Sequence, residues 1–139
     1  MLGSVDHIGY LTRDLEAGID LARELFELPV VRRFERPQFD LQGAYLGEGD
    51  GHVEVFTFND AKLLAGRIGD ERLKLDHVAY EVDDIVAYAS HLTSRGVRFS
   101  GPGLRGELHD PADLGGVLHL WTVPETTGGT CLQLMQRLR

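Results

Sequence analysis

The chain has 139 residues, of which 42% are hydrophobic, and its formal net charge is -8. This length is close to the usual size of one domain, and such a chain buries roughly two-thirds of its unfolded surface, so we expect one compact core. The 14 Lys and Arg residues are scattered among 22 Asp and Glu residues, which excludes the clustered positive charge of a nucleic-acid-binding protein.

The first half begins with a strand and a helix. VDHIGYL has the pattern of a short strand, and Leu15, Ile19 and Ala22 then form an apolar stripe at helical spacing, with Asp14 as a cap or first-turn acid. Three β-prone runs follow, separated by Pro37 or by the turn GEGDG: PVVRRFE, GAYLGEG and HVEVFTF. The order of elements in this half is therefore βαβββ.

The next stretch, NDAKLLAGRIGDER, is predicted to be a helical linker capped by Asn59 or Asp60. A second helix with Asp84 at its start follows another strand, and the runs VRFSG, VLHLWTV and CLQLMQ supply three more strands. This half is again βαβββ. We expect a single domain, residues 1–139, with module one at about 4–58, the linker at about 59–73 and module two at about 74–137.

An internal repeat relates the two halves. When the sequence is shifted by 70 residues, VDHIGYLTRDL aligns without a gap with LDHVAYEVDDI, so that His7 meets His77. A four-stranded sheet with one helix leaves its other face bare, so the two modules must share a surface. We expect an α+β fold in which two curved mixed sheets enclose a shared cleft and bring His7 and His77 together.

Strand alternation adds two polar residues to this pair. In HVEVFTF, Glu54 lies on the face opposite Val53 and Val55, and in CLQLMQ, Gln133 lies opposite the leucines beside it. The two stretches are equivalent under the duplication. Two imidazoles, a carboxylate and an amide oxygen would suit a divalent ion of Co, Ni, Zn, Mn or Fe, although an isolated strand histidine is more often a hydrogen-bonded core residue.

These motifs resemble those of the vicinal oxygen chelate superfamily, which includes glyoxalases, bleomycin-resistance proteins and dioxygenases. Within it, LDHVAYEVDDI, VEVF and GGTCLQLMQ are most similar to methylmalonyl-CoA epimerases and glyoxalase I proteins. The resemblance implies a divalent metal bound by His7, Glu54, His77 and Gln133. It also implies a homodimer that acts on a small molecule, either an acyl-CoA or a glutathione adduct.

One position departs from these relatives, which usually have Glu where this chain has Gln133. A carboxamide brings no charge and cannot accept a proton at neutral pH. The predicted proton acceptor is therefore Glu54, a metal-bound hydroxide, or a loop residue such as His109, and the sequence leaves these alternatives open.

Three classes of function fit the pattern. The first is a metal-dependent isomerase or epimerase that forms an enolate, similar to methylmalonyl-CoA epimerase, with a glyoxalase I-like lactoylglutathione lyase as its alternative. The second is an extradiol-type dioxygenase, which the absence of a carboxylate at Gln133 disfavours. The third is a ligand-binding protein of the antibiotic-resistance kind, which the histidine pair disfavours.

Several other residues receive open interpretations. Tyr45 and Gln42 could line the pocket, and His119 could face either the core or the cleft. Three arginines, Arg32, Arg33 and Arg36, form either a solvated strand face or a binding surface for an anion such as a CoA phosphate.

The expected location is the cytoplasm, without a membrane partner. The stretch MLGSVDHIGYL lacks the pattern of a secretion signal, and no run of 18 apolar residues occurs. Cys131 is the single cysteine, which excludes an internal disulfide, and it has the character of a small packed thiol.

Overall fold

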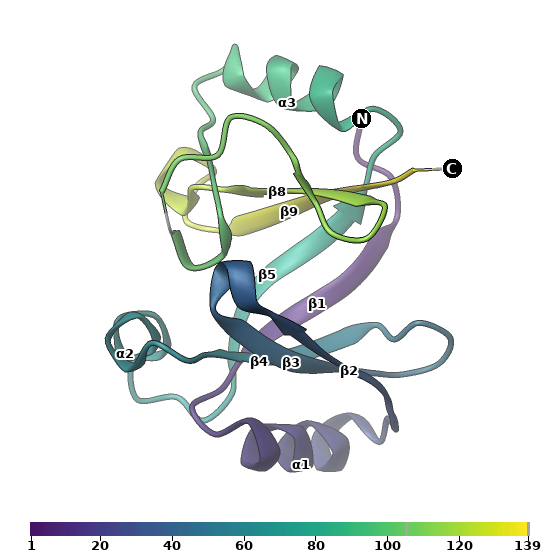
Figure 1. The fold of residues 1–139 in the computed structure, drawn as a ribbon, viewed down its shortest axis with the longest axis vertical. Helices are drawn as coiled ribbons and strands as arrows, with labels where there is room; N and C mark the ends of the chain where they lie inside the picture. The colour runs from purple at the N-terminus through teal and green to yellow at the C-terminus, as the bar shows by residue number, and fades with distance from the viewer. Residues whose placement is uncertain (105, 139) are drawn as a thin grey trace. The chain divides into compact units, whose positions relative to one another are not determined.

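The computed structural model describes residues 1–104 and 106–138. Its internal contacts divide the chain into two units (Figure 1). The first unit is His7–Asp76, and the second joins Met1–Asp6 to the chain from His77 onward. Each unit is described separately below.

The first unit contains a mixed sheet with α1 along one face (Figure 1). Its elements are β1 (Val5–Leu11), of which the part from His7 belongs here, α1 (Leu15–Phe26), β2 (Val30–Arg36), β3 (Leu41–Leu46), β4 (Val53–Phe58) and α2 (Ala61–Ile68). The strand order is β2-β3-β4-β1, with β1 parallel to β4 and the other pairs antiparallel.

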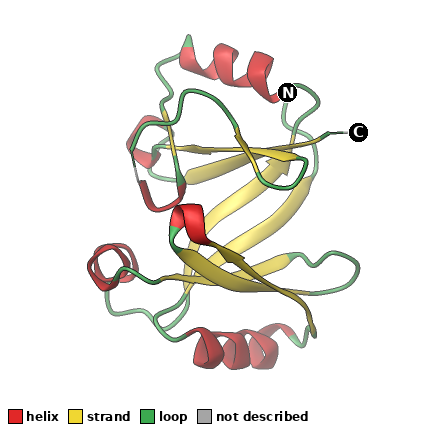
Figure 2. Cartoon of the chain, viewed as in Figure 1, coloured by secondary structure: helices red, strands yellow, loops and turns green. Residues whose placement is uncertain are grey.

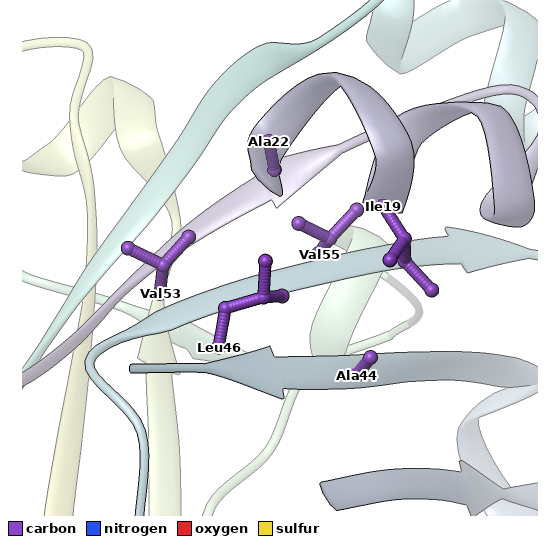
Figure 3. Close-up of a cluster of buried hydrophobic side chains, with 6 residues drawn as sticks. All are labelled: Ile19, Ala22, Ala44, Leu46, Val53 and Val55. Carbon is purple, nitrogen blue, oxygen red and sulfur yellow. The ribbon is translucent and has the colours of Figure 1, made fainter. Parts of the chain in front are cut away.

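Helix α1 is held by its cap and by its buried face. The Asp14 side chain accepts a hydrogen bond from the Ala17 backbone N–H at 3.1 Å, as predicted for a residue before the first turn. Figure 3 shows Ile19 and Ala22 of this helix directed at the sheet. The sheet residues of this cluster are buried and come from β3 and β4: Ala44, Leu46, Val53 and Val55.

The second unit repeats this plan. Its elements are β5 (Lys74–Glu81), of which the part from His77 belongs here, α3 (Ile85–Thr93), β6 (Phe99–Ser100), β7 (Ala112–Asp113), β8 (Val117–Thr122) and β9 (Cys131–Arg137). The order is β5-β9-β8-β6, with β5 parallel to β9 and with β7 paired to β8. The first residues of the chain join this unit, because the Gly3 N–H donates to the Glu81 carbonyl at 2.8 Å.

One face of the second sheet packs against α3. Ile85 of the helix and Phe99, Leu120 and Leu134 of the sheet belong to one buried cluster. Because successive strand residues point to opposite faces, Gln133 lies on the sheet face that is turned away from α3. The apolar core thus fixes which polar residues occupy the other face.

The α+β class and the two βαβββ modules predicted from the sequence are confirmed, and Figure 2 shows helices and strands in each unit. Asp84 caps α3 through the Ala87 N–H at 2.9 Å, and Asp60 caps α2. The stretch GELHDPADLGG, where His109 was expected to lie in a loop, also contains the short strand β7, which pairs with β8. Among the described residues, no helix is long and apolar enough to cross a membrane.

Two helical glycines in the first unit provide a test of this packing. A Cβ on Gly18 would lie 2.4 Å from the Thr12 hydroxyl oxygen, whereas a Cβ on Gly66 would meet nothing within 4 Å. We expect Gly18→Ala to lower the free energy of unfolding by about 1–3 kcal/mol through overpacking. The control Gly66→Ala should raise it by roughly 0.5–1 kcal/mol through helix propensity. Urea denaturation measures both, and equal effects would contradict the close approach of α1 to Thr12.

Candidate functional site

The first unit brings His7 and Glu54 together. Gly9 of β1 lies opposite Glu54 of β4, and His7, two residues earlier, shares the face of Gly9. The His7 Nε2 and Glu54 Oε2 atoms are 3.5 Å apart. Both residues are buried: His7 is fully buried, and Glu54 is 8% exposed. The structure thus places a buried imidazole beside a buried carboxylate.

Tyr45 orients this carboxylate. It lies opposite Glu54 in the β3–β4 ladder, and its hydroxyl donates a hydrogen bond to Glu54 Oε2 at 2.8 Å. Its ring also meets the His7 imidazole edge to face, with the centroids 5.4 Å apart. Burial, followed by the Glu54 charge and hydrogen bond, raises the pKa of Tyr45 far above its ordinary value. The phenol therefore stays protonated and remains a hydrogen-bond donor to the carboxylate.

The second unit arranges His77 and Gln133 in a similar way. In the parallel β5–β9 ladder, Ala79 lies opposite Gln133 and His77 opposite Cys131, so His77 and Gln133 share one face. Both are 4% exposed. Each module therefore has a histidine on its first strand and a polar residue on the same face of its last strand, as the sequence repeat predicted.

The Gln133 amide is held by a residue whose role the sequence left open. Its Nε2 atom lies 2.8 Å from Nδ1 of His119, which stacks on Trp121 with ring centroids 5.6 Å apart. An amide nitrogen can only donate, so in this arrangement Nδ1 accepts and the His119 proton resides on Nε2. The amide oxygen of Gln133 is then directed away from Nδ1. The sequence left open whether His119 faces the core or the cleft. The structure places it on the sheet face that carries Gln133, turned away from the core under α3.

We call His7 with Glu54 one half-site and His77 with Gln133 the other. The pairing of neighbouring strands is similar in the two half-sites. Tyr45 lies opposite Glu54 in the first unit, and Trp121 lies opposite Gln133 in the second. An aromatic ring thus stands beside the polar residue of each last strand. Neither pairing is evident from the sequence repeat, because the gapless alignment covers only the first strand and the helix.

His109, the other proposed proton acceptor, lies away from Gln133. His109 is exposed, with its Nε2 atom 3.7 Å from Glu107 Oε2, and it borders a hollow beside α3 that is also lined by Phe99 and Leu120. That is the helix-facing side of the sheet, opposite the face of Gln133. The role of His109 as a proton acceptor stays a prediction and gains no support from this position.

The expectation for Gln42 was wrong. Gln42 lies opposite Thr57, on the sheet face turned away from Tyr45, and its amide nitrogen donates to Asn59 Oδ1 at 3.1 Å. Strand alternation explains the difference, because residues 42 and 45 are an odd number of positions apart. Tyr45 is therefore the residue of this strand that can act on Glu54.

These features define a chain of paired βαβββ modules with a histidine and a polar residue on equivalent strands. The family described as Glyoxalase/Bleomycin resistance protein/Dioxygenase superfamily matches residues 4–118. The protein belongs to this family, as the sequence resemblance indicated. No curated protein matches the chain at a significant level.

Solved structures of methylmalonyl-CoA epimerases share the fold. The enzyme from Mycobacterium tuberculosis superposes with a TM-score of 0.78 at 17% identity, covering 97% of this chain and 88% of that one. A Streptomyces coelicolor variant in complex with 2-nitronate-propionyl-CoA gives 0.77 at 17% identity, covering 100% of both chains. An epimerase in complex with methylmalonyl-CoA and NH4+ gives 0.76 at 18% identity, covering 99% and 96%. At these identities the likeness establishes the fold.

Proposed function

We propose that the protein is a divalent-metal-dependent enzyme that moves a proton at a carbon next to a carbonyl, with methylmalonyl-CoA as the first substrate to test. The observation that supports this most directly is the half-site of the first unit, where buried His7 and Glu54 lie 3.5 Å apart. The proposed ligand set adds His77 and Gln133, their counterparts by duplication. The family includes all three classes of function. The epimerases among the structures that share the fold support this reaction as the first to test.

The donor chemistry fits a divalent metal. His7, Glu54 and His77 are buried groups that each offer a ligand atom to a metal ion. Imidazole nitrogens and a carboxylate oxygen bind Zn²⁺ and related ions at about 2.0–2.2 Å, so two neighbouring ligand atoms fall roughly 3 Å apart. The separation of His7 Nε2 from Glu54 Oε2 is near that value. Gln133 would add a neutral oxygen, which hard and borderline ions accept.

The bound ion would polarise the substrate carbonyl and lower the barrier to loss of the neighbouring proton. The chain's own residues then handle the proton. We assign Glu54 as its acceptor: the Cα–H bond breaks, its electron pair moves toward the carbonyl oxygen, and the proton joins the carboxylate. Tyr45 fixes the orientation of that carboxylate through its hydrogen bond to Oε2. A proton from solvent then adds to the opposite face of the carbon and inverts the centre, while Glu54 releases the abstracted proton to solvent and becomes a carboxylate again.

Deuterium incorporation tests the proposal. Metal-reconstituted protein is incubated with methylmalonyl-CoA in heavy water, and entry of deuterium at the α-carbon is followed by mass spectrometry. We expect incorporation above the enzyme-free rate that is lost in His7→Ala. If only the adduct of methylglyoxal and glutathione is converted, the reaction is that of a glyoxalase. Conversion of neither compound would refute proton transfer as the function.

We also propose that the protein is a homodimer, as the family resemblance implies. The proposed location is the cytoplasm, as expected from the sequence. Sedimentation velocity of the metal-loaded protein measures its mass, and a monomer at all concentrations would contradict the dimer.

A further inference from the structure

The edge strand β2 carries arginines on both faces of the first unit's sheet. Arg33 faces α1 and forms two hydrogen bonds with the Glu16 carboxylate, at 2.6 and 3.0 Å. Its charge is therefore neutralised by a neighbour. Arg32 and Arg36 are different, because neither forms an ion pair with a carboxylate among the described residues.

A β-bulge brings Arg32 to the face of Glu54. The ladder between β2 and β3 shifts register between Val30 and Arg32, so that Val30 packs in the core under α1 while Arg32 lies opposite Tyr45. Tyr45 in turn lies opposite Glu54. Without the extra residue, strict alternation would have turned Arg32 toward the helix.

Both guanidinium groups rest on aromatic rings. The Arg32 Cζ atom lies 4.5 Å from the centroid of the Tyr45 ring, and the Arg36 Cζ atom lies 5.0 Å from that of Phe34. The two rings are themselves 5.0 Å apart. A guanidinium stacked on a ring can still donate from its N–H edges to an anion, while the contact restricts the side chain to few conformations. One N–H group of Arg36 already donates to the Glu35 carbonyl at 3.0 Å, which leaves Arg32 the better placed of the two.

The arrangement joins a positive group to the proposed reaction centre through one side chain. Tyr45 contacts Glu54 with its hydroxyl and supports Arg32 with its ring face. In a chain of net charge -8, Arg32 and Arg36, which form no ion pair with a carboxylate in residues 1–104 and 106–138, offer local attraction for an anion on this face. Arg32 is exposed, so a ligand can reach it.

We propose that Arg32 binds an anionic group of the substrate, a carboxylate or a phosphate, while the reacting carbonyl lies at His7 and Glu54, and that Arg36 adds longer-range attraction. This inference rests on the proposed function, since it names the substrate chemistry of the same site. In an acyl-CoA the anion has two sources, the carboxylate of the acyl group and the phosphates of the carrier.

Calorimetric titration with three probes separates these sources. Methylmalonyl-CoA carries both anions, propionyl-CoA lacks the acyl carboxylate, and the methylmalonyl thioester of pantetheine lacks the CoA phosphates. With metal-loaded protein we expect Arg32→Gln to weaken methylmalonyl-CoA binding about tenfold to a hundredfold, because charge-assisted hydrogen bonds are lost. Arg36→Gln should cost about two- to fivefold. The control Arg33→Gln, on the other face of the same strand, should change the Kd less than about twofold.

The penalty with the other probes identifies the group that Arg32 contacts. If it persists with the pantetheine thioester and disappears with propionyl-CoA, the ligand of Arg32 is the carboxylate, and the reverse pattern assigns a phosphate. Wild-type affinity of Arg32→Gln for every probe, or a wild type that binds none of them, overturns the inference. Arg32-dependent binding without deuterium exchange in the wild type leaves this subsite standing and removes the proposed reaction.

Discussion

Replacing His77 by alanine is expected to lower the affinity of the protein for Co²⁺ by a factor of about 10³ or more. His77 is a buried imidazole on the first strand of the second module, where it matches His7 by duplication. The proposed site has only four protein ligands, so the remaining three no longer enclose the ion when His77 is lost. A water molecule that takes its place is held less firmly and does not recover the energy of the lost bond. Titration of apo-protein with Co²⁺, followed by visible absorption, measures the change.

Two further variants make this result specific. His91→Ala removes an exposed histidine from α3 and should leave Co²⁺ affinity unchanged within about twofold, because no ligand atom is lost. His77→Leu keeps most of the buried volume and offers no ligand atom, so it separates loss of a ligand from loss of packing. If His77→Ala binds Co²⁺ as the wild type does while remaining folded, His77 is not a ligand.

The sequence predicted those parts of the structure that depend on local pattern. The match of His7 with His77 is read from a 70-residue repeat, and the caps Asp14 and Asp84 from their residue type before each helix. The strand faces of Glu54 and Gln133 and the apolar stripes of the helices follow from periods of two and 3.6 residues. Such periods are fixed by backbone geometry. They do not require knowledge of which strand lies beside which.

The contacts that tune each half-site depend on register between strands. His119 meets Gln133 only because the connection through Pro124–Thr126 aligns β8 with β9. Arg32 lies over Tyr45 only because a bulge reverses the face that alternation predicts. Register across a long turn, or across a bulge, is set by packing of the whole sheet, and no local sequence period carries it.

Adding a carboxylate at position 133, or removing the one at position 54, is expected to change the Co²⁺ affinity strongly. Gln133→Glu should tighten Co²⁺ binding by about tenfold or more, because a second carboxylate adds Coulombic attraction to the ion. His119 can accommodate this change by placing its proton on Nδ1, where it would donate to the new carboxylate and support its orientation. Glu54→Gln should weaken binding by a similar factor, since it removes the acid of the proposed ligand set. The same Co²⁺ titration, applied to each variant, gives the affinities.

The double variant, Glu54→Gln with Gln133→Glu, distinguishes a shared site from two separate effects. If both residues bind one ion, it restores a single carboxylate and should return the Co²⁺ affinity to within about tenfold of the wild type. Gln136→Glu adds the same charge to β9 at a residue whose side chain accepts from the Ile85 N–H, on the α3 side, and should leave the affinity nearly unchanged. If Gln133→Glu and Gln136→Glu tighten Co²⁺ binding equally, the effect comes from the net charge of the protein and not from a ligand at position 133. Unchanged affinity in Gln133→Glu would place Gln133 outside the ligand set and leave His7, Glu54 and His77 as the proposed ligands.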